Sequence, residues 1–76
     1  MNAKRRKEIL KAIVLIEQAK DILEYVAEEE QEAFDNLPES LQYSERGDRM
    51  QEIADGINDV CRELEDQISN LEDTME

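Results

Sequence analysis

The side chains best suited to hold a ligand gather within one short stretch. They are Phe34, Asn36, Tyr43, Arg46 and Arg49. A tyrosine ring can stack on a nucleobase, and a guanidinium beside the free N–H groups of a helix N-terminus can hold a phosphate. A purely structural interpretation is also open. In that case the apolar side chains cap the end of a helical core, and the arginines pair with nearby glutamates.

No other pattern in the chain indicates catalysis. The sequence has no His, so no nucleophile can be activated by an imidazole, and it has no Gly-rich phosphate loop. Glu24, Glu28 and Glu32 recur every four residues and would share a helix face, but acids are common throughout the chain. The spacing of a calcium-binding loop is also missing. We therefore expect a protein that is not an enzyme, with no cofactor and no metal site.

Charge is distributed unevenly along the chain. The net charge is −12, from 21 Asp/Glu and 9 Lys/Arg. Residues 1–20 carry six Lys/Arg against two Glu (+4), whereas residues 28–76 carry seventeen acids against three Arg (−14). Direct DNA binding by this acidic body is not expected, because DNA affinity comes mainly from Lys/Arg contacts to phosphates. Both a solvated acidic surface and a mimic of nucleic-acid phosphates fit the composition.

The single cysteine and the short apolar runs indicate a cytoplasmic protein. Cys61 cannot form an intrachain disulfide, and its place among apolar residues is typical of a small core side chain. The longest apolar run, residues 12–16, is five residues. A membrane span needs about 20, and a signal peptide also needs a longer run. We expect no membrane partner.

Two long helical patterns, at about 3–34 and 45–74, flank a connector at about 35–44. With Ile9 at heptad position a, apolar residues recur at positions a, d and e of both patterns, which predicts one broad apolar stripe on each helix. Small residues at d in the first helix favour close approach of a partner helix. These small residues are Ala12, Ala19 and Ala33.

The connector carries helix start and stop signals. Pro38 ends the first pattern. Asn36 with Glu39 three residues later has capping-box spacing, which predicts a short helical turn at 38–42. Ser44 is the expected N-cap of the second long helix. Gly47 in its first turn costs about 1 kcal/mol of helix propensity relative to Ala, which is consistent with close packing, ligand approach or no special role.

Four apolar residues of the first helix lie outside its stripe and predict self-association. They are Leu10, Val14, Leu15 and Ile22. A helix that is apolar on more than one side is buried on more than one side. The expected fold is therefore all-α. It is a single-domain, long antiparallel helical hairpin with a short helical turn in the connector, assembled as a homodimer or larger helical bundle. Antiparallel packing would also bring the basic residues 4–7 beside the acidic residues 72–76.

The connector sequence resembles a family of small acidic helical proteins encoded by phages and prophages. The resembling stretch runs Ala-Phe-Asp-Asn-Leu-Pro-Glu-Ser-Leu-Gln-x-Ser-Glu-Arg-Gly-x-x-Met, from Ala33 to Met50. The pattern of a basic start and an acidic second helix extends the likeness over nearly the whole chain. The resemblance implies a phage accessory protein in the cytoplasm of a host bacterial cell. It supplies no catalytic or binding residues, because the function of the family is uncharacterised.

Three functional hypotheses follow for a small phage protein acting against a host system. The first is an oligomeric sponge that sequesters a nucleotide immune signal through the connector residues. The second is an acidic nucleic-acid mimic, or another inhibitor of a host protein, that binds through its acidic surface. The third is a purely structural assembly protein. All three are non-enzymatic.

Overall fold

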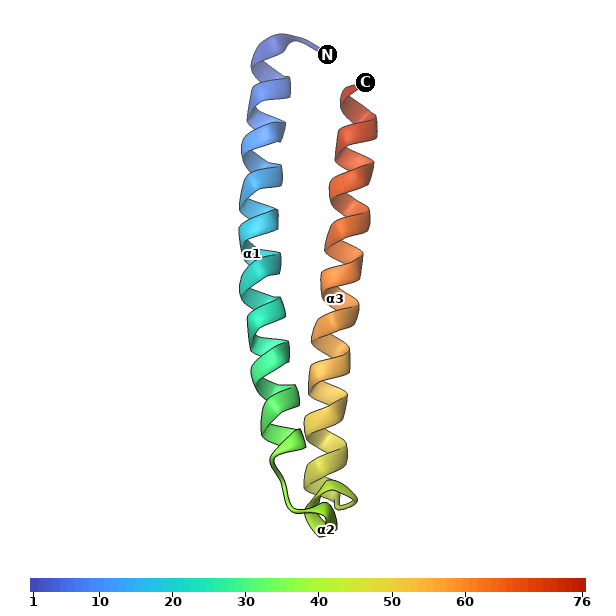
Figure 1. Ribbon diagram of the computed structural model, residues 1–76. Coiled ribbons are helices and arrows are strands. Elements are labelled where there is room, and N and C mark those ends of the chain that lie inside the picture. The colour runs from blue at the N-terminus through green and yellow to red at the C-terminus, as the bar shows by residue number, and fades with distance from the viewer.

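The protein consists of two long antiparallel helices and a short one. The computed structural model describes all residues, 1–76. It contains α1 (Ala3–Asp35), α2 (Glu39–Gln42) and α3 (Glu45–Met75). α1 and α3 lie side by side, so that the two termini meet at one end and α2 closes the other (Figure 1). Each long helix extends one residue beyond the C-terminal limit expected from the sequence. The molecule is a rod measuring 58 × 15 × 12 Å.

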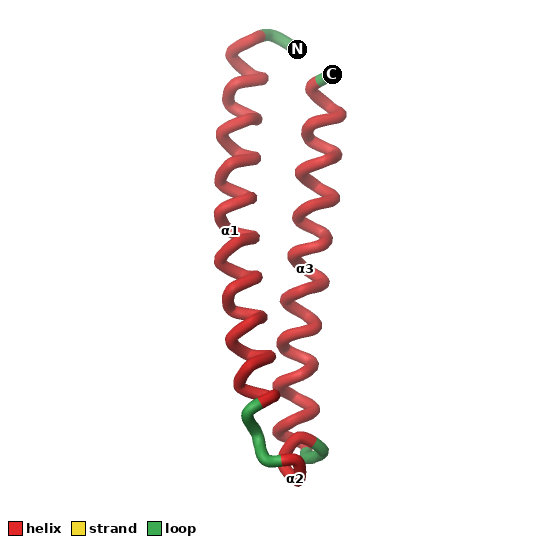
Figure 2. The backbone as a smooth tube through the Cα atoms, viewed as in Figure 1, coloured by secondary structure: helices red, strands yellow, loops and turns green.

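The two long helices, α1 and α3, are each capped at their start by a side chain. The remaining loops lie at the two ends of the rod (Figure 2). The Asn2 side chain accepts a hydrogen bond from the backbone N–H of Arg5 at 2.8 Å. Ser44 caps α3 as predicted, because its hydroxyl oxygen accepts from the backbone N–H of Gly47 at 3.3 Å. Each cap satisfies one of the free N–H groups at a helix start.

The predicted capping role of Asn36 is wrong. Asn36 has φ −86° and ψ −5°, a helical conformation, and its backbone N–H donates to the carbonyl of Glu32 at 3.0 Å. It therefore ends α1, whereas an N-cap residue needs extended backbone. The short helix α2 follows Pro38 directly and has no side-chain cap.

Two interhelical contacts fix how α1 and α3 are aligned. The Cys61 thiol lies 3.8 Å from the carbonyl oxygen of Lys20. Gln31 and Gln51 exchange amide hydrogen bonds at 3.2 and 2.8 Å. Residues of α1 and α3 whose numbers add to about 81 or 82 are therefore level with each other. Counting in heptads from the first contact places the remaining layers. These are Ile13 level with Ile68, Ala27 with Ala54, and Phe34 with Gly47.

The buried residues all belong to these layers, which occupy heptad position e. They are Ile13, Ala27, Gly47, Ala54, Cys61 and Ile68. The half-buried residues at position a, such as Ile16 and Leu64, complete the contact. Positions e and a alternate at spacings of three and four residues, so they form a coiled-coil-like seam. The ribbons of α1 and α3 lie closer together toward the connector than at the termini (Figure 1).

The d positions do not join this seam. Ala12, Ala19 and Ala33 are exposed, and so are Ile53 and Val60 on α3. At about 100° per residue, position d lies about 80° away from the midpoint between a and e. A single partner helix that packs against this midpoint therefore leaves the d positions exposed. The predicted stripe across a, d and e is thus divided into a buried seam and an exposed apolar flank.

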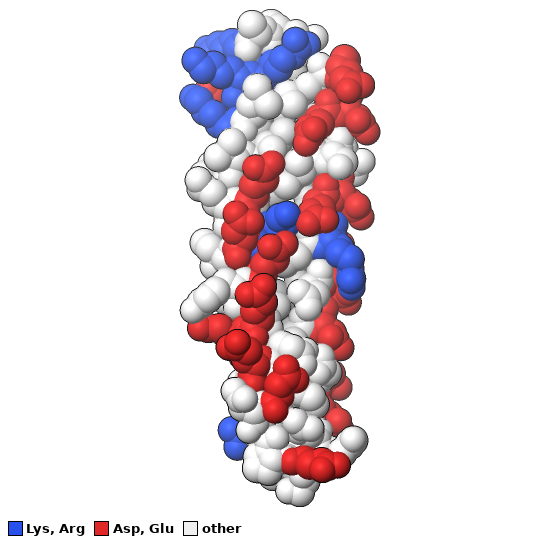
Figure 3. Space-filling view, viewed as in Figure 1, with Lys and Arg blue, Asp and Glu red and all other residues white.

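At the open end, opposite charges lie near one another without forming ion pairs. Figure 3 shows the basic cluster at the start of α1 beside acidic residues at the end of α3. The only link between them is a hydrogen bond from Arg6 Nη2 to the carbonyl oxygen of Met75, at 3.0 Å. The four ion pairs of the structure involve other residues. The expected proximity is present, but it rests on general attraction and one backbone contact.

Candidate binding surfaces

The end of α2 packs against the start of α3 through backbone contacts around Gly47. A Cβ atom at Gly47 would meet the carbonyl oxygens of Gln42 and Leu41, the latter at 2.6 Å. Real Cβ atoms essentially never come so close to a carbonyl oxygen. Only glycine lets the end of α2 rest against the first turn of α3. The close-packing interpretation of Gly47 therefore accounts for its position.

Two polar side chains of the connector are used internally. Gln42 Nε2 donates to the carbonyl oxygens of Phe34 and Asp35, each at 3.3 Å, and so ties α2 to the last turn of α1. The Ser44 hydroxyl donates to the carbonyl oxygen of Leu41 and also caps α3. The bond from Gln42 satisfies the carbonyl of Asp35 at the end of α1. The carbonyls of Phe34 and Leu41 also accept from the backbone N–H groups of Leu37 and Ser44. The sequence pattern of the connector indicates a polar side chain at Gln42 but no internal role for it.

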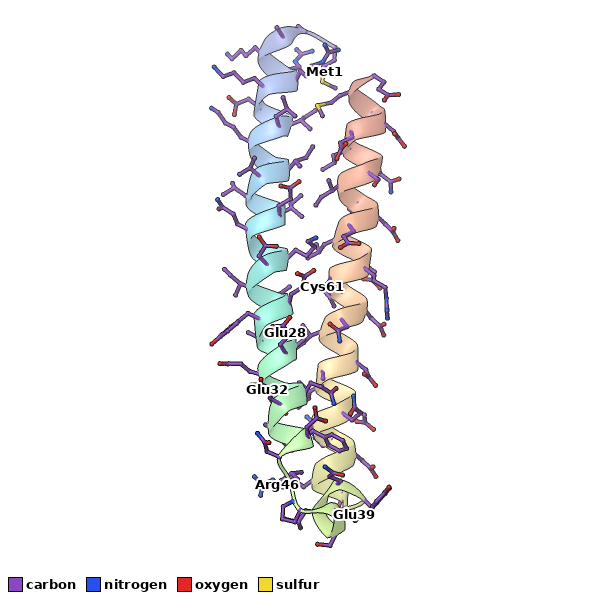
Figure 4. All side chains as sticks on the ribbon, viewed as in Figure 1. Met1, Glu28, Glu32, Glu39, Arg46 and Cys61 are labelled. Carbon is purple, nitrogen blue, oxygen red and sulfur yellow. The ribbon has the colours of Figure 1, made fainter.

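The five predicted ligand residues are not gathered into one hollow. Phe34 is half-buried in the seam, whereas the other four are exposed; Tyr43 is 81% exposed. Neither Arg46 nor Arg49 takes part in an ion pair, so the expected pairing with nearby glutamates is absent. Figure 4 shows Arg46 at the connector end of the rod. Their role in binding stays a prediction.

One side of the seam carries an acidic face around Lys20. Lys20 Nζ lies 3.0 Å from Glu65 Oε1 and 3.7 Å from Glu24 Oε1, so both acids lie on the same side of the seam. A shallow hollow at this point is lined by Glu17, Asp21 and Glu65 together with Lys20, Ile68 and Ser69. The hydrogen bond to Glu65 raises the pKa of Lys20 above 10.5, and the neighbouring acids add to this shift.

We define the acidic face as Glu17, Asp21, Glu24, Glu28 and Glu65. The α1 members recur every three or four residues, so they follow one side of that helix. Figure 3 shows acidic residues running along the middle of the rod on this side, and Figure 4 places Glu28 on the same stretch of α1. No group of three or more acidic or cysteine side chains is arranged to hold a metal ion.

The opposite side of α1 carries exposed apolar residues. Leu15 and Ile22 are 65% and 64% exposed, and both occupy heptad position g, next to the d positions. On α3, Ile53 and Val60 lie on the same flank of the seam, because equivalent heptad positions face the same side in an antiparallel pair. We define the apolar stripe as the exposed d and g residues of α1 between 12 and 26. They are Ala12, Leu15, Ala19, Ile22 and Val26.

The four residues predicted as an oligomer interface are all exposed, but they do not share one side of α1. Leu10 and Val14 are 49% and 50% exposed. At about 100° per residue they lie about 120° around the helix from Leu15 and Ile22, on the side that carries the acidic face. Only Leu15 and Ile22 belong to the apolar stripe. Whether any of the four contacts another chain stays a prediction.

Cys61 is shielded inside the seam. Its side chain is buried beside Lys20, and this burial raises the pKa of the Cys61 thiol above its ordinary value of 9.0. Because the thiolate is the reactive form, burial makes the thiol a poor nucleophile. The sequence interpretation of Cys61 as a small core residue is confirmed.

A second hollow lies at the start of α1 and is lined mainly by polar and charged residues, including Asn2, Lys4 and Arg5. No helix is sufficiently long and apolar to cross a membrane. No protein-family model matches the chain, and no curated protein or solved structure is significantly similar to it.

Proposed function

We propose that the chain is a phage or prophage accessory protein that acts by non-enzymatic binding, as a helical oligomer in the host cytoplasm. We further propose that its acidic face engages a basic surface of a host protein. The observation that carries this proposal is the gathering of exposed carboxylates from both long helices on one side of the seam, in the middle of the rod. The phage setting rests on the resemblance of residues 33–50 alone.

The chemistry of the face supports a cationic macromolecular partner. Glu17, Asp21 and Glu28 are exposed and have no basic partner within 4.0 Å. The one lysine on this side, Lys20, is already matched by Glu24 and Glu65. Uncompensated carboxylates steer a basic partner toward the surface, and this attraction weakens as salt is raised. A protein groove that normally holds nucleic-acid phosphates has the complementary charge.

The test is affinity capture from a bacterial host lysate, using the immobilised chain and two variants of equal net charge. The first variant removes charge from the acidic face: Glu17→Gln, Asp21→Asn and Glu28→Gln. The matched control removes the same charge from exposed positions on other sides of α3: Glu52→Gln, Glu63→Gln and Asp66→Asn. We expect a partner that the wild type and the control retain, that the first variant loses, and that moderate salt elutes.

Two outcomes would contradict this proposal. Equal loss in both variants would mean that net charge, not the face, attracts the partner. Loss through Tyr43→Ala or Arg46→Ala, with the acidic face tolerant of neutralisation, would favour the connector and a nucleotide ligand. Circular dichroism of each variant checks that the helices remain formed.

A further inference from the structure

We propose that a second copy of this chain packs on the apolar stripe, with the two α1 helices antiparallel and crossing at Ala19. This inference deepens the oligomer of the proposed function by naming the surface, the orientation and the register. The stripe residues alternate at spacings of three and four, which is the pattern of a coiled-coil seam. α1 thus carries two seams, one filled by α3 and one exposed.

The angle between the two seams fits a four-helix arrangement. The midpoint of positions d and g lies about 110° around α1 from the midpoint of a and e. A helix in a four-helix bundle contacts two neighbours at roughly this separation. Ile53 and Val60 of α3 border the same flank, so the second copy would also lie against them. The acidic faces of both copies would remain on the outside.

The stripe is complementary to itself when it is reversed. An antiparallel crossing at Ala19 places Ala12 level with Val26 of the second copy, and Leu15 within one residue, about 1.5 Å along the helix axis, of Ile22 of the second copy. A small residue therefore meets a medium one, two large residues meet each other, and the two Ala19 residues allow close approach at the centre. Such matching of large and small side chains gives dense packing without voids.

Charge supports the same orientation. In this register the basic start of α1 comes level with the acidic last turns of α1 in the second copy. Lys4 and Arg5 come within about one turn of Glu32 of the second copy. Glu8 comes beside Glu29 of the second copy, but the four basic residues 4–7 outnumber this one acid, so attraction prevails. A parallel α1 pair would instead place basic residues beside basic residues and acids beside acids. Opposite charges beside a helical seam select orientation in this way.

The exposed area is of the size that a dimer interface removes. The chain exposes 5798 Å². A compact monomer of 8.9 kDa exposes about 4,800 Å² by the usual scaling of surface with mass. The excess of about 1,000 Å² is close to the roughly 800 Å² that each partner buries in a standard interface. A second copy therefore accounts for surface that the hairpin alone leaves exposed.

The first measurement is the mass of the purified chain in solution by light scattering, for the wild type and two double variants. The wild type should be a dimer of about 18 kDa, twice 8.9 kDa. Leu15→Asn with Ile22→Asn should weaken the dimer by about 100-fold or more, because four large apolar side chains lose their burial. Leu10→Asn with Val14→Asn is the matched control, since it removes two exposed apolar residues of the same helix that lie outside the apolar stripe, and it should leave the dimer intact.

The second measurement tests the register at the centre of the apolar stripe. In a Cys61→Ala background, Ala19→Cys should form an interchain disulfide under mild oxidation, because the two sites face each other at the crossing and disulfides need Cα atoms within about 7 Å. Val14→Cys should not. A monomeric wild type would overturn the proposal, as would a dimer lost only through Leu10 and Val14. A dimer that crosslinks at position 14 rather than 19 would overturn the register. Acidic-face capture is measured separately, so it can persist when the dimer proposal fails.

Discussion

The two ends of the rod are held by different physical means. At the closed end, carbonyl oxygens of α2 rest against Gly47, and Gln42 and Ser44 bond to neighbouring carbonyls. At the open end, a basic and an acidic cluster face each other with one hydrogen bond to the backbone between them. Packing at fixed distances specifies a conformation, whereas attraction between exposed charges is diffuse and screened by salt. The closed end should therefore tolerate substitution far less than the open end.

The largest effect is expected at Gly47. Gly47→Ala places a methyl group against two backbone carbonyl oxygens, so α2 must move; we expect the free energy of unfolding to fall by about 2–3 kcal/mol. Gly56→Ala is the control, because a Cβ there meets nothing within 4 Å. That change should raise stability by about 0.5–1 kcal/mol through helix propensity. Urea denaturation measures both, and a harmless Gly47→Ala would show that the connector is loosely packed.

A smaller loss is expected for the cap of α3. Ser44→Ala removes the acceptor for the N–H of Gly47 and the donor to Leu41, and should cost about 1 kcal/mol. Ser69→Ala, in the body of the same helix, should change stability by no more than about 0.5 kcal/mol. If the two serine variants unfold at the same urea concentration, the cap does not contribute to the rigidity of the closed end.

The middle of the rod should respond to alkaline pH in a way that neither end does. Burial raises the pKa of Cys61. A hydrogen bond to Glu29 raises the pKa of Tyr25, and a hydrogen bond to Glu65 raises the pKa of Lys20. The folded chain thus holds these protons more tightly than the unfolded chain. Their contribution to stability is complete below the ordinary values and is lost as pH rises past them, beginning near 9.0 for Cys61.

The urea midpoint should accordingly decline between pH 8 and pH 10.5. Cys61→Ala should delay the start of this decline, because it removes the group with the lowest ordinary pKa of the three. A midpoint that stays level or rises over this range would show that the seam does not favour the protonated groups.

The smallest effect is expected at the open end. Arg6→Gln removes the bond to the Met75 carbonyl but leaves the surrounding charges, and should change the free energy of unfolding by no more than about 0.5 kcal/mol. The difference in unfolding free energy between wild type and variant should become smaller in about 0.5 M salt, because exposed charges are screened. A loss comparable to that of Gly47→Ala would remove the contrast between the two ends.

The sequence predicted the helices and the Ser44 cap because both depend on local signals. Three signals are sufficient to locate the helices and the cap: Pro38, the absence of Gly and Pro from residues 3–34, and the serine before Glu45. The division of the apolar residues into seam and stripe could not be predicted in the same way. Positions d and e flank position a almost equally, and the choice depends on which residues of α3 face α1.

For a similar reason, the sequence predicted the charge of the candidate surfaces but not which residues gather on them. The acidic character of the chain is a matter of composition, but the gathering of Glu24 and Glu65 around Lys20 needs the interhelical register. Likewise, Gln42 and Gly47 stabilise the connector through contacts with backbone carbonyl oxygens. Every residue has a backbone carbonyl, so the sequence does not indicate which of them will be contacted. Asn36 was wrongly predicted as an N-cap because α1 extends to Asp35, so that Asn36 closes the last turn of that helix.

The layer sizes along the seam give the hairpin a taper, from small residues at Ala27 and Ala54 to large ones at Ile13 and Ile68. Tapered units stacked in the same orientation accumulate curvature and fan into an arc. Units that alternate in direction cancel it, since the narrow end of one lies beside the wide end of the next. In the proposed antiparallel pair, the narrow end of one hairpin would lie beside the wide end of the other, so the two tapers would cancel.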